Sequence, residues 1–307
     1  MTSGIRFLPC YTAVLRQVAN PVDVIGYLSG IKDPVTIRFH GGDVLTGVSD
    51  RFWAMGMIMY CDYARRIGIY KSSDLIALND IASDSTRRLR ADPLSPGARF
   101  GYRPALLFPL VRKFRPKMVI ETGVAQGLST YVILKALHEN DNNATLVSID
   151  APNYETRYVG STREVGWLVP EDLRDGWRLE LGRSSEILPR LNKPIDMFYH
   201  DSLHNYETMS FEFEWAYSHL VEEGVLASDD ISASSAWKKF GELHPDMKTI
   251  LPVRNFGNMV KSRSHFRGAS GAPLPVDTRA NVTVRRTEEQ PLEGAIVQPP
   301  QKLTRPN

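Results

Sequence analysis

Short apolar runs alternate with amphipathic segments from residue 102 onward, and this alternation predicts the fold. The apolar runs have the length of strands and cover residues 117–121, 145–150, 177–182, 195–201 and 224–230. Segments with a helical period, such as residues 129–137, lie between them. Continuous apolar runs are typical of strands buried on both faces, so the pattern indicates an α/β fold with a parallel sheet covered by helices. Residues 247–251 and 256–261 are predicted to close the sheet in the antiparallel direction.

The first 98 residues have a different pattern, which predicts a small α+β region. The stretch VTIRFHGGDVLTG alternates around Gly41 and Gly42, as expected for a hairpin. The run RFWAMGMIMYCDYARR then has the methionine and aromatic content of a helix buried in the protein's own core, with a dimer surface as the other interpretation. The PLSPG stretch at residues 93–97 marks a boundary, so we predict an accessory region over 1–98 and the main domain over 99–264.

The last segment of the chain, residues 265–307, is rich in proline and poor in large apolar side chains. Such a segment cannot bury enough surface to offset the entropy lost on ordering. We therefore predict a disordered tail.

The composition of the chain narrows the class of protein. The 307 residues are 42% hydrophobic and 23% charged with a net charge of +2, so no general affinity for nucleic acid is expected. The two cysteines, Cys10 and Cys61, form neither a disulfide framework nor a metal-binding motif, which suits a reducing compartment. Nowhere do about 18 apolar residues run together, so we predict no membrane span and a cytoplasmic location.

Acidic residues stand at the ends of the predicted strands, and they are the main functional clue. The strand ends carry Glu121, Asp150, Asp201 and the pair Asp229 and Asp230. Ligands of open α/β sheets bind just outside the carboxyl ends of the strands, so these acids are expected to face a common crevice.

A glycine-containing turn, ETGVAQGLST, follows the first of these strands. Gly123 and Gly127 allow a tight turn that brings backbone N–H groups close to a ligand at the start of the next helix. The spacing lacks the third glycine of a dinucleotide-binding motif, so a nucleotide without a pyrophosphate fits better. Asp150, at the end of the next strand, can accept hydrogen bonds from both hydroxyls of a ribose. A simple strand–turn–helix junction is the alternative.

These motifs together resemble a known family. ETGVAQGLS, SID, DMFYHDSLHNYE and GVLASDD are similar to the motifs of class I S-adenosylmethionine-dependent methyltransferases, especially the small-molecule O-methyltransferases, over about residues 99–262. The resemblance implies a Rossmann-like, doubly wound sheet and S-adenosyl-L-methionine as cofactor. It places the methionine part of the cofactor at the loop, the ribose at Asp150 and the adenine near Arg183 and Ser184. The implied cofactor-binding residues are Glu121, Thr122, Gly123, Ala125, Gly127, Ser129, Asp150, Arg183 and Ser184.

The acids after the fourth and fifth strands predict a metal site. Asp201, Asp229 and Asp230 occupy the positions at which catechol and macrolide-sugar O-methyltransferases carry their metal ligands. Three converging carboxylates repel one another unless a cation compensates them, and an all-oxygen site suits Mg²⁺ or another divalent cation. In the alternative, one of Asp229 and Asp230 caps the following helix at residues 231–240 and the other is solvated.

His204 is the predicted catalytic residue. It lies three residues after Asp201, where the catechol enzymes carry a basic residue that takes the proton of the attacking hydroxyl. Histidine is well suited to that task near neutral pH. His200 is predicted to point away from Asp201, because neighbouring strand residues face opposite sides of a sheet.

The resulting prediction is a metal-assisted O-methyltransferase that acts on a small hydroxylated acceptor, such as a sugar or a phenolic natural product. Three alternatives remain: a metal-independent methyltransferase, a catalytically silent domain that binds the cofactor or a partner, and a nicotinamide-dependent oxidoreductase. Neither the acceptor nor the formation of a homo-oligomer follows from the sequence.

Overall fold

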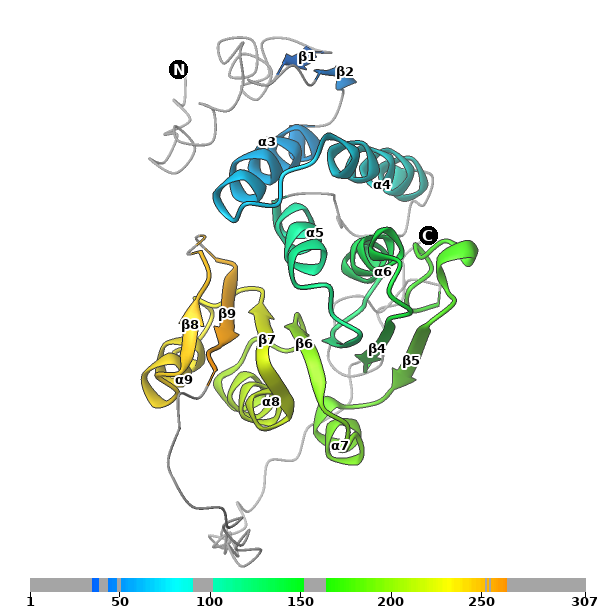
Figure 1. Cartoon of the computed structure of the whole chain (residues 1–307). Helices are drawn as coiled ribbons and strands as arrows, with labels where there is room; N and C mark the ends of the chain where they lie inside the picture. Colours follow the sequence, from blue (N-terminus) through cyan, green and yellow to red (C-terminus); the bar gives the residue numbers. More distant parts are fainter. Residues whose placement is uncertain are drawn as a thin grey trace, which may run out of the picture. The chain divides into compact units, whose positions relative to one another are not determined.

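Seven strands form the central sheet in the computed structural model (Figure 1). The structure describes residues 35–38, 44–48, 51–90, 102–151, 164–251, 253 and 255–263. The strands of the sheet are β3 (Met118–Thr122), β4 (Thr145–Asp150), β5 (Trp177–Leu181), β6 (Ile195–His200), β7 (Leu220–Ser228), β8 (Met247–Thr249) and β9 (Gly257–Lys261). Their order is β5-β4-β3-β6-β7-β9-β8. The first five pair in parallel, and β9 pairs antiparallel with both β7 and β8, which confirms the predicted fold class.

Helices connect and cover these strands. They are α3 (Arg51–Arg66), α4 (Ser72–Arg90), α5 (Tyr102–Phe114), α6 (Leu128–Asn140), α7 (Ser184–Ile187), α8 (Tyr206–His219) and α9 (Ala236–Leu243), with short 3-10 helices at Glu171–Leu173 and Leu188–Arg190. The chain leaves β3 toward β4 and β5 on one side and adds β6 and β7 on the other. The strand order therefore reverses between β3 and β6, where ligands of such sheets bind.

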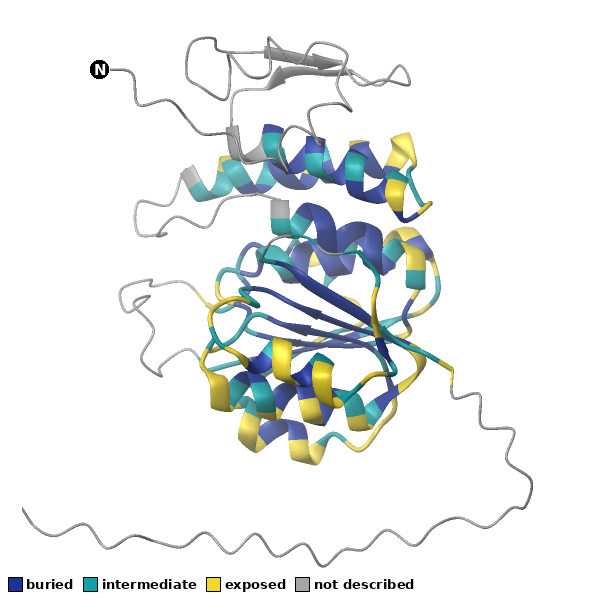
Figure 2. Ribbon diagram, turned by 90° about the vertical axis from the view of Figure 1, so that its left-hand side faces the viewer, coloured by how far each residue is buried: buried dark blue, intermediate teal, exposed yellow. Residues whose placement is uncertain are grey.

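The sheet separates two hydrophobic cores, because successive strand residues point to opposite faces. Val119 and Tyr199 pack with buried residues of α3 to α6. Ile120 and Phe198, their neighbours in sequence, pack instead with residues of α7, α8 and α9. Figure 2 shows the resulting layers, with dark blue strands between two groups of helices. Burial on both faces explains why the strands read as continuous apolar runs.

Helices α3 and α4 of the N-terminal region share one of these cores. Strands β1 (Val35–Arg38) and β2 (Val44–Val48) pair antiparallel as predicted, although Gly41 and Gly42 between them lie outside the described residues. Helix α3 matches the predicted buried helix, and its Met57 and Tyr60 are buried in the same cluster as Phe108 of α5. The methionine-rich helix is thus part of the intramolecular core, and the hydrophobic core runs across the predicted boundary at residues 98 and 99.

The remaining predicted segments are described only in part. The chain divides into two compact units, Met1–Ser264 and His265–Asn307, and this division falls where the tail is predicted to begin. Residues 93–97 and 265–307 lie outside the described residues, as does Cys10, whereas Cys61 is a buried free thiol.

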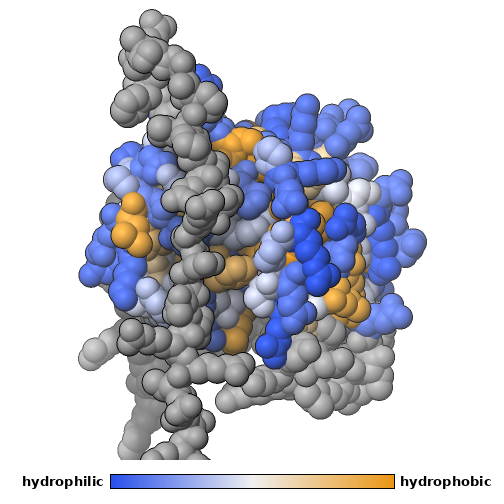
Figure 3. All heavy atoms as spheres, turned by 90° about the horizontal axis from the view of Figure 1, so that it is seen from below, coloured by the Kyte–Doolittle hydropathy of each residue, from blue (hydrophilic) through white to orange (hydrophobic). Residues whose placement is uncertain are grey.

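Among the residues that the structure describes, few large apolar side chains are exposed. In Figure 3 the visible coloured surface is mainly hydrophilic, and hydrophobic residues form separate groups. Among the described helices, none is both long and apolar enough to cross a membrane.

Candidate functional site

The loops after β3 and β6 meet at the point where the strand order reverses. Gly123 has a φ of +84°, and a Cβ atom at this position would lie 2.0 Å from the carbonyl oxygen of Asp201. Only glycine avoids both the strain of this φ and the clash. The first glycine of the ETGVAQGLST turn is therefore required for contact between the predicted cofactor loop and the predicted acidic site.

Asp150 holds the glycine loop in place. Its Oδ2 accepts hydrogen bonds from the backbone N–H groups of Val124, at 2.7 Å, and Ala125, at 2.9 Å. Ala125 and Gly127 also have positive φ angles, so the loop bends sharply before α6 begins. The carboxylate of Asp150 therefore holds the shape of the loop through one of its two oxygens.

Glu121 is completely buried and is surrounded by hydroxyl groups. Its Oε1 accepts a hydrogen bond from Ser129 at 2.6 Å, and its Oε2 accepts from Thr130 at 2.7 Å and Ser148 at 2.6 Å. Burial raises the pKa of Glu121 to about 7, although these hydrogen bonds act in the opposite direction. Glu121 and Ser129, both predicted to bind the cofactor, thus bond to each other and connect β3 with α6.

Two further predicted cofactor-binding residues, Arg183 and Ser184, lie at the start of α7. The side chain of Arg183 is exposed, whereas Ser184 is half-buried and contributes to lowering the pKa of Glu212 of α8. Thr122 donates a hydrogen bond to the same carboxylate, at 2.6 Å. Thr122 and Ser184 thus both act on Glu212.

Glu212 is a buried residue that the sequence reasoning did not identify. Its Oε2 accepts from Nδ1 of His200 at 2.6 Å, and its Oε1 accepts from the hydroxyl of Ser202 at 2.8 Å. Burial alone would raise the pKa of Glu212, but the hydrogen bonds from His200, Ser184 and Thr122 lower it. His200 contacts Glu212 and Phe213 of α8, and its ring lies edge-on to that of His204 with 5.3 Å between centroids. This network fixes the segment that carries Asp201 and His204.

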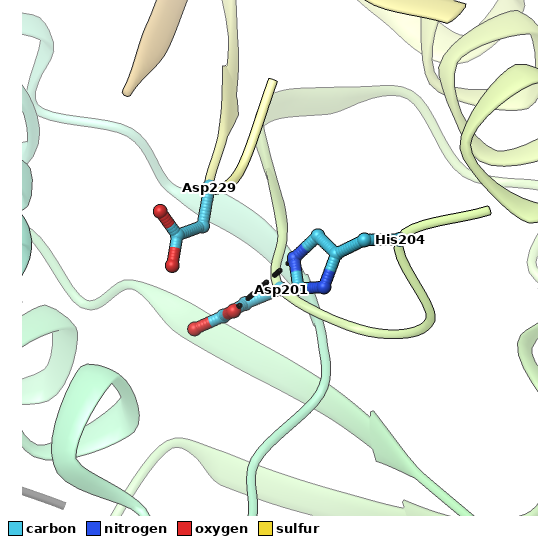
Figure 4. Close-up of side chains that lie close together, drawn as sticks. All are labelled: Asp201, His204 and Asp229. Atoms are coloured by element: carbon cyan, nitrogen blue, oxygen red, sulfur yellow. Dashed lines mark ion pairs between the residues drawn. The ribbon is translucent and has the colours of Figure 1, made fainter. Parts of the chain in front are cut away.

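Asp201, His204 and Asp229 lie together beyond the ends of β6 and β7 (Figure 4). One potential ligand atom from each residue lies within 4.8 Å of the others. Nε2 of His204 is 3.6 Å from Oδ1 of Asp201, too far for a hydrogen bond, and has no other hydrogen-bond partner in the described structure. The imidazole nitrogen and the two carboxyl groups are ligand types that divalent cations accept, so these residues fit a metal ion.

Asp230 is the third predicted metal ligand, but the structure directs its carboxylate toward other side chains. Its Oδ1 accepts hydrogen bonds from Nη2 of Arg103, at 2.7 Å, and from the side-chain amide of Asn255. The group of possible ligands within the described chain contains His204 in place of Asp230. Neither Asp229 nor Asp230 caps the next helix, because α9 begins at Ala236 with Ser235 as its N-cap residue.

Arg103 provides a positive charge that the sequence reasoning missed. It lies in the first turn of α5, and its Nε is 2.7 Å from Oδ1 of Asp229. The same guanidinium contacts Asp230, so it bridges the two neighbouring acids. An arginine far from any strand end carries no local sign of this role, because the contact exists only once α5 packs beside β7.

The carboxyl groups of the site hold their protons more tightly than free carboxyl groups do. Burial, followed by the nearby charge of Asp229, raises the pKa of Asp201 well above its ordinary value. Burial also raises the pKa of Asp229 to about 6, although Arg103 acts against this effect. Burial lowers the pKa of His204, which favours the neutral imidazole. A neutral imidazole close to acidic side chains can accept a proton from a bound hydroxyl group.

Comparison with known proteins identifies similar domains. Residues 120–231 match a family described as "Methyltransferase domain". No curated protein sequence matches the chain with significance.

Similar solved structures include three proteins of low sequence identity. SAH-bound methyltransferase PaMTH1 of Podospora anserina is 15% identical, with 60% of this chain and 88% of that chain covered and a TM-score of 0.45. A putative O-methyltransferase from Klebsiella pneumoniae is 15% identical, with 61% and 90% covered and a TM-score of 0.44. The O-methyltransferase TomG from Streptomyces achromogenes, in complex with SAM, is 18% identical, with 60% and 87% covered and a TM-score of 0.42.

Proposed function

Because residues 120–231 match a methyltransferase-domain family, we propose that this protein transfers a methyl group from S-adenosyl-L-methionine to a hydroxyl group of a small molecule, with the assistance of a divalent cation. One observation carries the proposal. The glycine loop that would hold the cofactor packs through Gly123 against the backbone of Asp201, which stands beside His204. A methyl donor at the loop would therefore lie next to a carboxyl group and an imidazole.

The loop and Asp150 offer polar groups that would suit the cofactor. The Oδ1 atom of Asp150 would accept a hydrogen bond from a ribose hydroxyl, while Oδ2 holds the loop. Arg183 and Ser184, after β5, supply polar groups near the expected adenine position. S-adenosyl-L-methionine would provide an electrophilic methyl group on its sulfonium, and alignment with the acceptor oxygen accounts for much of the catalysis in such transfers.

The acidic residues and His204 divide the remaining tasks. Asp201 and Asp229 would hold the divalent cation, and His204 would accept the proton of the acceptor hydroxyl. A bound cation would lower the pKa of that hydroxyl. Leu203 and Tyr206, close to His204 in sequence, are exposed and offer apolar surface for an acceptor such as a phenol or a sugar derivative.

Calorimetric titration of S-adenosyl-L-methionine tests the cofactor, with Mg²⁺ present and again with a chelator. We expect affinity in the micromolar range in at least one condition. The absence of binding in both conditions would contradict the proposed function. Binding without turnover on a panel of phenols and sugars would favour the silent binding domain.

Variants of His204 test whether this residue acts as the general base or as a metal ligand. His204→Ala is expected to lower turnover at least about 100-fold while Mg²⁺ still binds, since general bases contribute 10²- to 10⁴-fold. The matched control is His138→Ala, because His138 is exposed on α6. Loss of Mg²⁺ binding in His204→Ala would instead identify His204 as a metal ligand.

The two neighbouring acids provide a second comparison. Asp229→Asn should weaken Mg²⁺ binding more than Asp230→Asn does, because Asp229 belongs to the group of possible ligands with Asp201 and His204, whereas Asp230 also bonds to Asn255. Equal losses, measured by calorimetry, would contradict this assignment.

A further inference from the structure

Arg103 occupies the place of a counter-ion in the acidic site. Its guanidinium contacts Oδ1 of Asp229 through Nε and Oδ1 of Asp230 through Nη2, both at 2.7 Å. Asp229 is also one of the three residues whose ligand atoms gather at the candidate metal site. We propose that Arg103 competes with a divalent cation for Asp229, so that the cation binds tightly only after the guanidinium has turned away. This inference rests on the proposed function, in which Asp201 and Asp229 hold the cation.

The charges of the site support competition. A guanidinium already within hydrogen-bonding distance of Asp229 offsets part of the negative charge that would attract a metal ion. A divalent cation bound to the same carboxylate would lie close to the guanidinium, and the two positive charges would repel each other. We therefore expect the presence of one cation to weaken the binding of the other.

The two acids would each keep a hydrogen-bond donor if Arg103 left. Oδ1 of Asp229 accepts a hydrogen bond from the backbone N–H of Asp230, at 2.8 Å. Asp230 keeps its bond from the side chain of Asn255. The side chain of Arg103 is 37% exposed and lies in the first turn of α5, and in the proposed movement its guanidinium turns toward water. Both acids thus retain a donor after the arginine departs.

Direct titration with Mn²⁺ tests this competition without an activity assay. We expect Arg103→Gln to bind Mn²⁺ at least about tenfold more tightly than the wild-type chain, because a competing charge has been removed. Arg178→Gln is the matched control. It removes the same charge from β5, at the edge of the sheet, where Arg178 pairs with Glu180. Circular dichroism and thermal unfolding with a chelator verify that each variant is folded.

Several outcomes would overturn the inference. These are equal Mn²⁺ affinity in the wild type and Arg103→Gln, no Mn²⁺ binding by either, or the same gain in Arg178→Gln. Titration of S-adenosyl-L-methionine into the same samples separates this inference from the proposed function. Cofactor binding together with unchanged Mn²⁺ affinity contradicts only the role of Arg103, whereas failure to bind the cofactor contradicts the proposed function.

A second measurement applies if Arg103→Gln does not fold. The Nε–H resonance of Arg103 in the wild-type protein can be identified by its absence from Arg103→Lys. Saturating Mg²⁺ should shift this resonance, since the guanidinium would exchange Asp229 for water. An unchanged resonance at saturation would show that the two cations do not compete.

Discussion

Glu121 combines complete burial with three hydroxyl donors, and its proton therefore affects folding. Burial raises its pKa from 4.5 to about 7, so the folded protein binds the proton more tightly than the unfolded chain does. A group with a raised pKa stabilises the fold at low pH, and this contribution is lost as the pH rises from 4.5 to about 7. The residue predicted to bind the cofactor thus also makes stability depend on pH.

The Glu121→Gln variant tests this dependence, because glutamine stays neutral at every pH. Relative to the variant, the wild type should lose up to about 3 kcal/mol of unfolding free energy between pH 4.5 and 7. Urea denaturation across this range measures the difference. Glu171→Gln, which changes an exposed carboxylate, should keep the wild-type profile. A constant difference between wild type and Glu121→Gln would contradict the raised pKa.

Individual site residues were predictable where a strand end carries them. Asp201 and Asp229 follow apolar runs, His204 was predicted from its spacing to Asp201 and a family resemblance, and the structure brings the three together. Arg103 and Glu212 belong to helices, and their roles depend on which helix packs beside which strand. No periodicity in the sequence contains that information.

Whole elements were more predictable than single contacts, because burial on both faces leaves a strong apolar signal. The strand predicted at residues 145–150 coincides with β4. The strand predicted at 224–230 is instead β7, Leu220–Ser228, because α8 ends at His219 and passes directly into the strand. The helix predicted at 231–240 begins only at Ala236, since turns occupy the preceding residues.

The turn between β3 and α6 supports a prediction for this element. Gly123→Ala should lower the unfolding free energy by about 2–5 kcal/mol, because the new Cβ meets the backbone of Asp201 in addition to the strained φ. It should also weaken binding of S-adenosyl-L-methionine. Thermal or urea unfolding and calorimetry measure the two effects.

Gly68 offers a matched control for this substitution. Its φ of +73° is similar, but a Cβ atom there would have no neighbour within 4 Å. Gly68→Ala should therefore cost only about 1–2 kcal/mol and leave cofactor binding unchanged. Equal costs at the two glycines would contradict the contact between the loops.

At the scale of the whole molecule, the sequence indicated a change of pattern near residue 98, but the core does not stop there. Buried side chains of α3 and α5 belong to one cluster. A composition boundary reports where local patterns change, whereas a shared core depends on contacts between distant segments. The predicted boundary at residues 98 and 99 therefore marks a change of sequence pattern and does not divide the hydrophobic core.

Two deletions test how the chain is divided. A fragment of residues 99–264 should lose cooperative unfolding and bind a hydrophobic dye, because it lacks the side chains of α3 that cover α5. A fragment of residues 1–264 should keep the thermal midpoint of the full chain, since it retains the first compact unit. Cooperative unfolding of residues 99–264 at the full-chain midpoint would show that the accessory region is dispensable.

The close contact between Gly123 and Asp201 also has a thermodynamic consequence. Two loops that touch through their backbones cannot shift independently, so a ligand that moves one of them changes the work needed to move the other. Coupling of this kind is reciprocal: if occupancy of the glycine loop strengthens binding at the acids, occupancy of the acids strengthens binding at the loop by the same factor. The total free energy of binding both ligands is the same whichever of them binds first.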